Sequence, residues 1–302
     1  MKEFIYITII SLFVTSNLYT QQIADTLFQP VIEQPAYLLG EGPVVAIDEA
    51  HHNFHTKRGR YQAFAKVLQK DGYIVRSFRT HINPDSLEKI DILVISNALN
   101  ERNVQDWSLP TPSAFSKQEI IALSTWIRKS GALLLIADHM PFPGATKELA
   151  EYLGFHFNNG FAMDTVKQSI TIFRRSDGSL ADHVITRGRN DAERIDSVRT
   201  FTGQAFQADS DARSLLVFGT SVISLMPEQA WQFNDQTSRI SVKGWLQGAT
   251  RKYGNGRIAV FGEAAMFTAQ HTNSGWIGLK SPGAEQNQTF LLNVMHWLSE
   301  IL

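Results

Sequence analysis

The stretch Ala132-Leu133-Leu134-Leu135-Ile136-Ala137, followed at once by Asp138-His139, decides the fold. A continuous apolar run of this length is typical of a strand buried on both faces of a sheet. Strands of this kind belong to parallel sheets that carry helices on both faces. The polar pair that follows then stands at the carboxyl end of the strand, where open α/β sheets bind their ligands.

Similar runs lie on either side of this stretch. Strands are predicted at Val44–Ile47, Tyr73–Phe78, Ile90–Ser96 and Arg257–Phe261, and helices over 59–70, 116–129, 144–153 and 287–301. Ser116 and Glu119 form a capping-box pattern at the start of the second of these helices. The alternation predicts one α/β domain over 43–302 with a mostly parallel, doubly wound sheet. The middle, roughly 156–250, is less regular, with candidate strands at Ser169–Phe173, Ser214–Gly219 and Trp245–Ala249.

The first twenty residues have the pattern of a secretory signal peptide. Lys2 precedes an apolar run over 4–14, and small and polar residues follow it. We therefore expect export to the periplasm or the extracellular space, with cleavage of 1–20 and no transmembrane anchor in the mature chain. An uncleaved N-terminal anchor is the alternative. Residues 21–42 are expected to form an extended lead-in to the domain.

Composition excludes some kinds of function. The 302 residues carry a net charge of -1, so the chain lacks the positive charge that is typical of nucleic-acid-binding proteins. There is no cysteine, so disulfides, a lipoprotein anchor and thiol catalysis are all excluded. A small polar molecule or a glycan remains as the expected partner.

Polar side chains follow four of the predicted strands. Asp48, Glu49, His51, His52 and His55 follow the first strand, Asn97 the third, Asp138 and His139 the fourth, and Glu263 the last. Since the carboxyl ends of parallel strands meet at one edge of the sheet, these groups are expected to converge there.

Three interpretations of this edge stay open. A divalent metal such as zinc would be held by His51, His52, His55 and Asp138. Acid–base chemistry without a metal would use Asp138, His139 and Glu263 as catalytic residues, with Asp48, Glu49, His52 and Asn97 binding the ligand. In the third interpretation the carboxylates cap helices and the histidines bond to loop backbone. The loops around Trp107, Phe142 and Trp276 would either stack on a sugar or pack, and packing is the simpler expectation.

The stretch Tyr253–Gln270 and the C-terminal Asn287–Leu298 resemble an exported bacterial family of unknown function. That family belongs to the class I glutamine-amidotransferase-like group, with gliding-motility, intraflagellar-transport and trehalose-utilisation-type domains as relatives. Asp182–Gly188 resembles a motif that follows the middle strands in those groups. The resemblance spans roughly 43–302.

The resemblance implies a flavodoxin-like fold and no particular activity. In working amidotransferases a cysteine occupies the elbow that corresponds here to Ala137–Pro141. Because this chain has Asp138 and His139 there, glutaminase activity is not expected. If the chain is an enzyme, we expect a hydrolase that acts on a polar small molecule or glycan. The alternative is a non-catalytic binding or scaffold domain of an envelope assembly.

Overall fold

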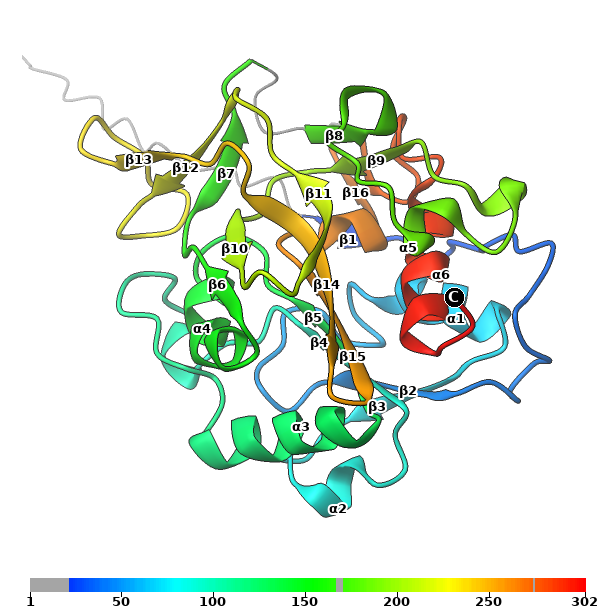
Figure 1. Cartoon of the computed structure of the whole chain (residues 1–302). Helices are drawn as coiled ribbons and strands as arrows, with labels where there is room; N and C mark the ends of the chain where they lie inside the picture. Colours follow the sequence, from blue (N-terminus) through cyan, green and yellow to red (C-terminus); the bar gives the residue numbers. More distant parts are fainter. Residues whose placement is uncertain (1–21, 167–170, 274) are drawn as a thin grey trace, which may run out of the picture.

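Five parallel strands form the core of the central sheet (Figure 1). The computed structural model describes residues 22–166, 171–273 and 275–302, so the expected signal peptide over 1–20 lies outside the described residues. The strands lie side by side in the order β3 (Ile74–Phe78), β2 (Val44–Asp48), β4 (Ile92–Ser96), β5 (Ala132–Ile136) and β15 (Gly256–Phe261). In chain order this arrangement is 2-1-3-4-5, the order of flavodoxin-like sheets.

Beyond β15 the sheet continues with antiparallel strands, which the expectation of a mostly parallel sheet did not include. β14 (Leu246–Tyr253) pairs with β15 and with β11 (Arg213–Val217), and the sheet ends with β10 (Phe206–Ala208) and β6 (Phe155–Phe157). The reversal is possible because Gly254 adopts φ +63° in the tight turn between β14 and β15. A Cβ there would lie 2.6 Å from the carbonyl oxygen of Arg128. The parallel core is thus extended on one side by a hairpin.

Helices cover both faces of the sheet, as predicted. α1 (Gln62–Lys70) and α6 (Asn287–Leu298) pack on one face, and α3 (Lys117–Lys129) and α4 (Phe142–Tyr152) on the other (Figure 1). Alternate residues of each strand point to opposite faces. Leu134 therefore belongs to the hydrophobic core on the side of α1 and α6, and Leu135 to the core on the side of α3 and α4. Among the described residues, no helix is both long and apolar enough to cross a membrane.

The predicted capping box is confirmed at the start of α3. Ser116 Oγ accepts a hydrogen bond from the backbone N–H of Glu119 at 3.3 Å, and Glu119 Oε2 accepts one from the backbone N–H of Ser116 at 3.0 Å. The short helices are α2 (Pro84–Leu87), α5 (Val184–Arg187) and the 3-10 turns Glu101–Asn103, Arg175–Asp177, Asp191–Glu193 and Ala265–Phe267.

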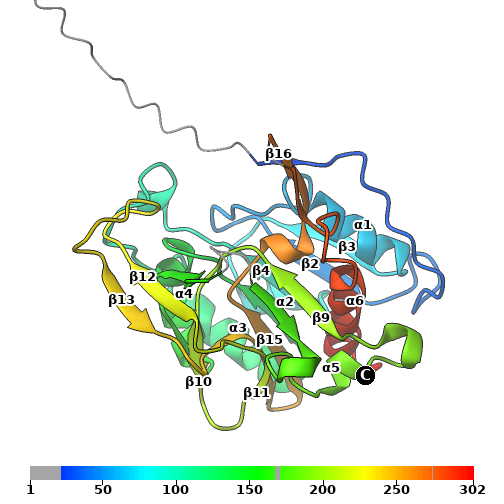
Figure 2. The same ribbon diagram turned by 90° about the horizontal axis from the view of Figure 1, so that it is seen from above.

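Small sheets complete the domain. β7 (Phe161–Asp164), β12 (Val222–Met226) and β13 (Ser238–Ser241) form one, and β8 (Thr171–Arg174) pairs with β9 (Ser197–Thr200). Part of the strand expected at Ser169–Phe173 lies outside the described residues. The lead-in contributes β1 (Ile23–Ala24), which pairs with β16 (Ala269–Thr272), itself paired with β17 (Gly275–Gly278). Figure 2 shows β16 at the top of the view, beside the start of the lead-in.

Candidate functional site

A cavity of about 680 Å³ opens at the carboxyl ends of β4, β5 and β15. The predicted residues Asn97, Asp138, His139, Glu263 and His55 all line it. The other lining residues come from loops, from the small sheets, from the start of α4 and from the turn Ala265–Phe267: Gln22, Phe54, Trp107, Phe142, Arg199, Phe201, Thr202, Trp231, Ala265, Gln270, Thr272, Gly275, Trp276, Ile277, Ser281 and Pro282. The strand-exit rule therefore located the cavity and part of its lining.

Three adjacent strand ends meet in the polar part of the cavity. Asn97, directly after β4, accepts a hydrogen bond at Oδ1 from the backbone N–H of Asp138 at 2.8 Å. Asn97 holds a left-handed backbone with φ +51°, which is uncommon for a residue other than glycine. Asp138 is 8% exposed, and its Oδ1 accepts from the backbone N–H of His139 at 2.8 Å. The side-chain amide of Asn97, after β4, thus fixes the backbone of Asp138, after β5.

Glu263 is the most deeply buried acid of the cavity, at 1% exposure. Its two carboxyl oxygens accept backbone hydrogen bonds from Ala265 and Met266, both at 2.8 Å. Burial, and after it the negative charge of Asp138, raise the pKa of Glu263 well above its usual range, although these backbone bonds act to lower it. A buried carboxyl group with a raised pKa, next to a second carboxyl group, is a feature of many acid–base sites.

His139 lines the cavity, and one of its ring nitrogens is bonded to the backbone. Its Nδ1 lies 2.8 Å from the carbonyl oxygen of Met140. Because a carbonyl oxygen can only accept, Nδ1 carries the proton and Nε2 of the neutral ring keeps its lone pair. The ring stacks on Phe161 at 4.5 Å between centroids and meets the edge of Trp231 at 4.6 Å. The imidazole is therefore held in one orientation by aromatic neighbours, with Nε2 available to take a proton.

Aromatic side chains form much of the cavity wall. Phe54, Trp107 and Phe142 contact one another with centroid distances of 5.2 to 5.6 Å. Trp231 is 38% exposed and Trp276 41% exposed, which is unusual for tryptophan. Trp107, Phe142 and Trp276, the aromatic residues of the three loops considered in the sequence, pack on other aromatic rings and also line the cavity.

Two further polar residues of the wall were not predicted. Gln270 in β16 is fully buried, and its Oε1 has no hydrogen-bond partner among the described residues. Arg199 in β9 brings a positive charge to the same cavity. An orphaned buried amide oxygen costs free energy unless a ligand or water donates to it. Arg199 does not follow a strand of the parallel core. Gln270 lies in the segment after the predicted strand Arg257–Phe261, but it was not among the predicted site residues.

His55 reaches the cavity as a neutral ring. Burial, and then the charges of Arg60 and His139, lower the pKa of His55 to about 3. Its ring packs on Tyr61 at 4.6 Å, and its Nδ1 lies 3.4 Å from Ser96 Oγ.

The remaining predicted residues lie outside the cavity lining. Glu49 binds the side chains of Ser77 and Arg79 and the backbone N–H of Lys57. Asp48 is fully buried and accepts from His51 Nδ1 at 2.8 Å, while His52 is exposed. Asp48 and Glu49 therefore serve their own loop and the neighbouring strand.

The four predicted metal ligands do not form one group. Across residues 22–166, 171–273 and 275–302, the His and acidic side chains whose ligand atoms lie within 4.8 Å of one another are His51, His81 and Glu119. His51 was predicted; His81 and Glu119 were not. In the sequence, the capping box alone accounts for Glu119. His81 follows the predicted strand Tyr73–Phe78 by three residues, so the strand-exit rule could have included it.

Comparisons with known proteins agree with the fold. No family model matches the chain, and no curated protein matches it. Among solved structures, the mmIFT52 N-terminal domain is similar with a TM-score of 0.60 at 14% identity, over 84% of this chain and 97% of that one. A cytoplasmic protein of Salmonella typhimurium LT2 is similar with a TM-score of 0.51 at 15% identity, over 84% and 98%. A ThuA-like protein from Bacteroides uniformis has a TM-score of 0.49 at 12% identity, over 87% and 94%. At such identities the two likenesses with TM-scores above 0.5 show a shared fold and nothing about activity.

Proposed function

We propose that this chain binds a polar small molecule or glycan in the cavity and hydrolyses a bond within it. The observation that carries the proposal is the meeting of Asp138, His139 and Glu263 inside one cavity with aromatic walls. Ligand sites are typically concave and largely apolar, with a few convergent polar groups and perturbed pKa values. A volume of about 680 Å³ falls within the usual range for such sites.

The wall suits a ligand that is apolar on its faces and polar at its rim, as sugar rings are. Trp107, Trp231 and Trp276 offer flat apolar surfaces, and tryptophan combines such a surface with one N–H donor. Arg199 and the orphaned Oε1 of Gln270 supply a donor and an acceptor for hydroxyl groups. An entirely apolar ligand would leave these polar groups without partners.

His139 is the residue that we assign as general base. Water would give a proton to Nε2 and its oxygen would bond to the electrophilic carbon. The bond from that carbon to the leaving group would then break, and the imidazolium would give the proton to the leaving group. The bond from Nδ1 to the carbonyl oxygen of Met140 keeps the required tautomer. Asp138 and Glu263 line the same cavity as the ring, and burial raises the pKa of Glu263.

One observation favours binding without turnover. Both oxygens of Glu263 are already held by backbone N–H groups, which also explains this residue as the anchor of the turn Ala265–Phe267. In this second candidate function the cavity recognises a glycan for a domain of a cell-envelope assembly, and His139 only shapes the wall.

The proposal extends to location and family. The pattern over 1–20 supports export to the periplasm or the extracellular space. The strand order 2-1-3-4-5 supports a place among the amidotransferase-like flavodoxin folds, with an acid and an imidazole where those enzymes keep cysteine. Cell fractionation with N-terminal sequencing of the mature protein tests the first point.

Binding and turnover are tested separately. Tryptophan fluorescence with a panel of oligosaccharides and their acylated forms should show saturable binding that Trp276→Ala weakens at least tenfold. Trp126→Phe, on α3 and outside the cavity, is the matched control. Hydrolysis of a bound compound should fall at least a hundredfold in His139→Ala with its binding retained. Saturable binding by the wild type with no turnover of any bound compound would favour the second candidate function.

A further inference from the structure

We propose that His51, His81 and Glu119 form a binding site for a zinc-like divalent cation, separate from the cavity. The ligand atoms would be His51 Nε2, His81 Nδ1 and Glu119 Oε1, which lie within 4.8 Å of one another. Oε1 of Glu119 is 3.0 Å from the first nitrogen and 3.2 Å from the second. This inference does not depend on the proposed hydrolysis.

Three elements that are distant in the chain bring these atoms together. His51 stands in the loop after β2, His81 in the loop between β3 and α2, and Glu119 in the first turn of α3. The backbone of His81 is itself fixed, because its carbonyl oxygen accepts hydrogen bonds from Asn83 Nδ2 and Ser86 Oγ at the start of α2. The convergence is therefore a product of the tertiary fold.

The donor set suits zinc. Two imidazole nitrogens and one carboxylate oxygen are a three-ligand set found in zinc proteins, where water or substrate takes the fourth position. The His81 side chain is 88% exposed, so an ion has a path from solvent and room for that fourth ligand. The other two side chains are buried, at 4% and 9% exposure, which restricts their movement.

The strongest support is the group behind His51. Its second ring nitrogen, Nδ1, lies 2.8 Å from Oδ2 of the fully buried Asp48. That carboxylate also accepts hydrogen bonds from Asn53 Nδ2 and the backbone N–H of Ala50. A carboxylate that receives the remote N–H of a histidine ligand fixes its tautomer and makes it more basic, as in metal sites generally. Asp48 thus aims Nε2 of His51 at the other two ligand atoms.

Glu119 is oriented in the same way. Its Oε2 is held by Ser116, through the backbone N–H at 3.0 Å and Oγ at 2.8 Å. Its Oε1 also accepts from the backbone N–H of Ile82 at 3.1 Å. With Oε2 occupied, Oε1 is the oxygen left to face both histidines, and an ion between them would replace two N–H···O contacts with three coordination bonds.

An ion here would also hold the loop that reaches the cavity. The loop after β2 carries His51 at one end and, a few residues later, Phe54 and His55 of the cavity lining. We therefore assign the site a structural role: it ties this loop to α3 and to the start of α2.

Calorimetric titration of the untagged full chain with zinc chloride, after treatment with EDTA and dialysis, tests the site. We expect one zinc per chain, with proton release because both histidines must be neutral to coordinate. Magnesium and calcium should bind far more weakly, since they prefer oxygen ligands.

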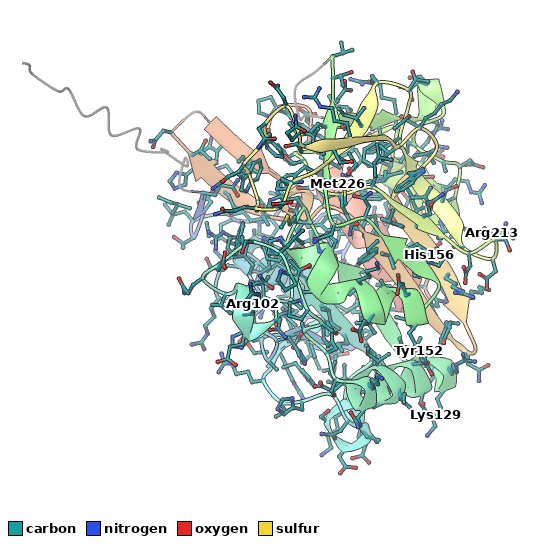
Figure 3. The ribbon with its side chains drawn as sticks, turned by 90° about the vertical axis from the view of Figure 1, so that its left-hand side faces the viewer. Arg102, Lys129, Tyr152, His156, Arg213 and Met226 are labelled. Atoms are coloured by element: carbon teal, nitrogen blue, oxygen red, sulfur yellow. The ribbon has the colours of Figure 1, made fainter. Side chains whose placement is uncertain are left out.

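Variants locate the ion. His81→Ala should weaken zinc binding at least tenfold without affecting the fold, because the side chain is exposed. Asp48→Asn should weaken it by about 10- to 100-fold, as loss of such an outer carboxylate does. His156→Ala is the matched control. This exposed histidine on β6 pairs with Asp209, and Figure 3 labels it together with Tyr152, the last residue of α4. His139→Ala should also leave zinc binding unchanged, which separates this site from the cavity.

Two results would overturn the inference. One is wild-type protein that takes up no zinc while circular dichroism shows it folded. The other is His81→Ala with the affinity of wild type, which would mean that any bound zinc lies elsewhere, in the cavity if His139→Ala abolishes binding. In either case the three side chains would be an ordinary hydrogen-bonded cluster.

Discussion

Replacing Glu119 by glutamine should cost stability in a manner that depends on pH. Burial acts to raise the pKa of Glu119, but hydrogen bonds from Ser116, His51 and Ile82 lower it from 4.5 to about 2. A carboxyl group with a lowered pKa stabilises the fold above its unfolded pKa, and this contribution is lost as the pH falls towards 2. Glu119→Gln removes the charge and with it this contribution.

The size of the effect follows from the shift. A fall of the pKa from 4.5 to about 2 corresponds to about 3 kcal/mol at pH 6. Because the partner His81 is exposed and solvent screens its contact, we expect about 2 kcal/mol for Glu119→Gln. At pH 3.5 Glu119 keeps only part of this contribution, so the difference between wild type and variant should shrink by about 1 kcal/mol.

Urea unfolding followed by tryptophan fluorescence, at pH 6 and pH 3.5 with EDTA present, measures both numbers. Glu148→Gln, an exposed glutamate on α4, is the control and should change stability by less than about 0.5 kcal/mol at either pH. A loss for Glu119→Gln that is the same at both values of pH would refute the reasoning, since a purely steric effect would not titrate.

Two other residues give sharp expectations. His55 has its pKa lowered from 6.5 to about 3, so its neutral form stabilises the fold near pH 7 and this contribution falls by about 3 kcal/mol on going to pH 4. His55→Phe should therefore unfold less readily in acid, relative to its stability at pH 7, and a variant with the acid sensitivity of wild type would contradict this assignment. Gly203 has φ +84°, and a Cβ there would lie 2.1 Å from the carbonyl oxygen of Gly262. Gly203→Ala should lose at least about 2 kcal/mol more in urea unfolding than Gly244→Ala, which has φ +78° but open space, and equal losses would exclude the clash.

The parallel core and one edge of the cavity could be predicted because they follow from local rules. Continuous apolar runs indicate buried strands, and parallel strands place their carboxyl ends together. Asn97, Asp138, His139 and Glu263 were found in this way, and all four line the cavity. Residues that directly follow a buried strand can be identified from the sequence alone.

The rest of the cavity depends on pairings that leave little trace in the sequence. Trp231, Arg199 and Gln270 come from a loop and from strands of the small sheets, whose partners are far away in the chain. The cluster of His51, His81 and Glu119 was not predicted for a different reason. The sequence explained Glu119 as a helix cap, and that explanation is correct, but only one of its two oxygens is needed for it.

The pairing of β1 with β16 has a consequence for how the protein is made. Ile23 lies opposite His271, so the first described strand must wait for a partner that is synthesised much later. Gln22 and β16 both line the cavity, so this part of its rim cannot form before Ala269–Thr272 have been synthesised. The pairing of strands that are distant in the chain, such as β1 and β16, is a slow step of folding. Until it occurs, the aromatic residues of the cavity wall remain exposed. A chaperone that recognises exposed aromatic residues would thus meet this protein through the same surface that later receives its ligand.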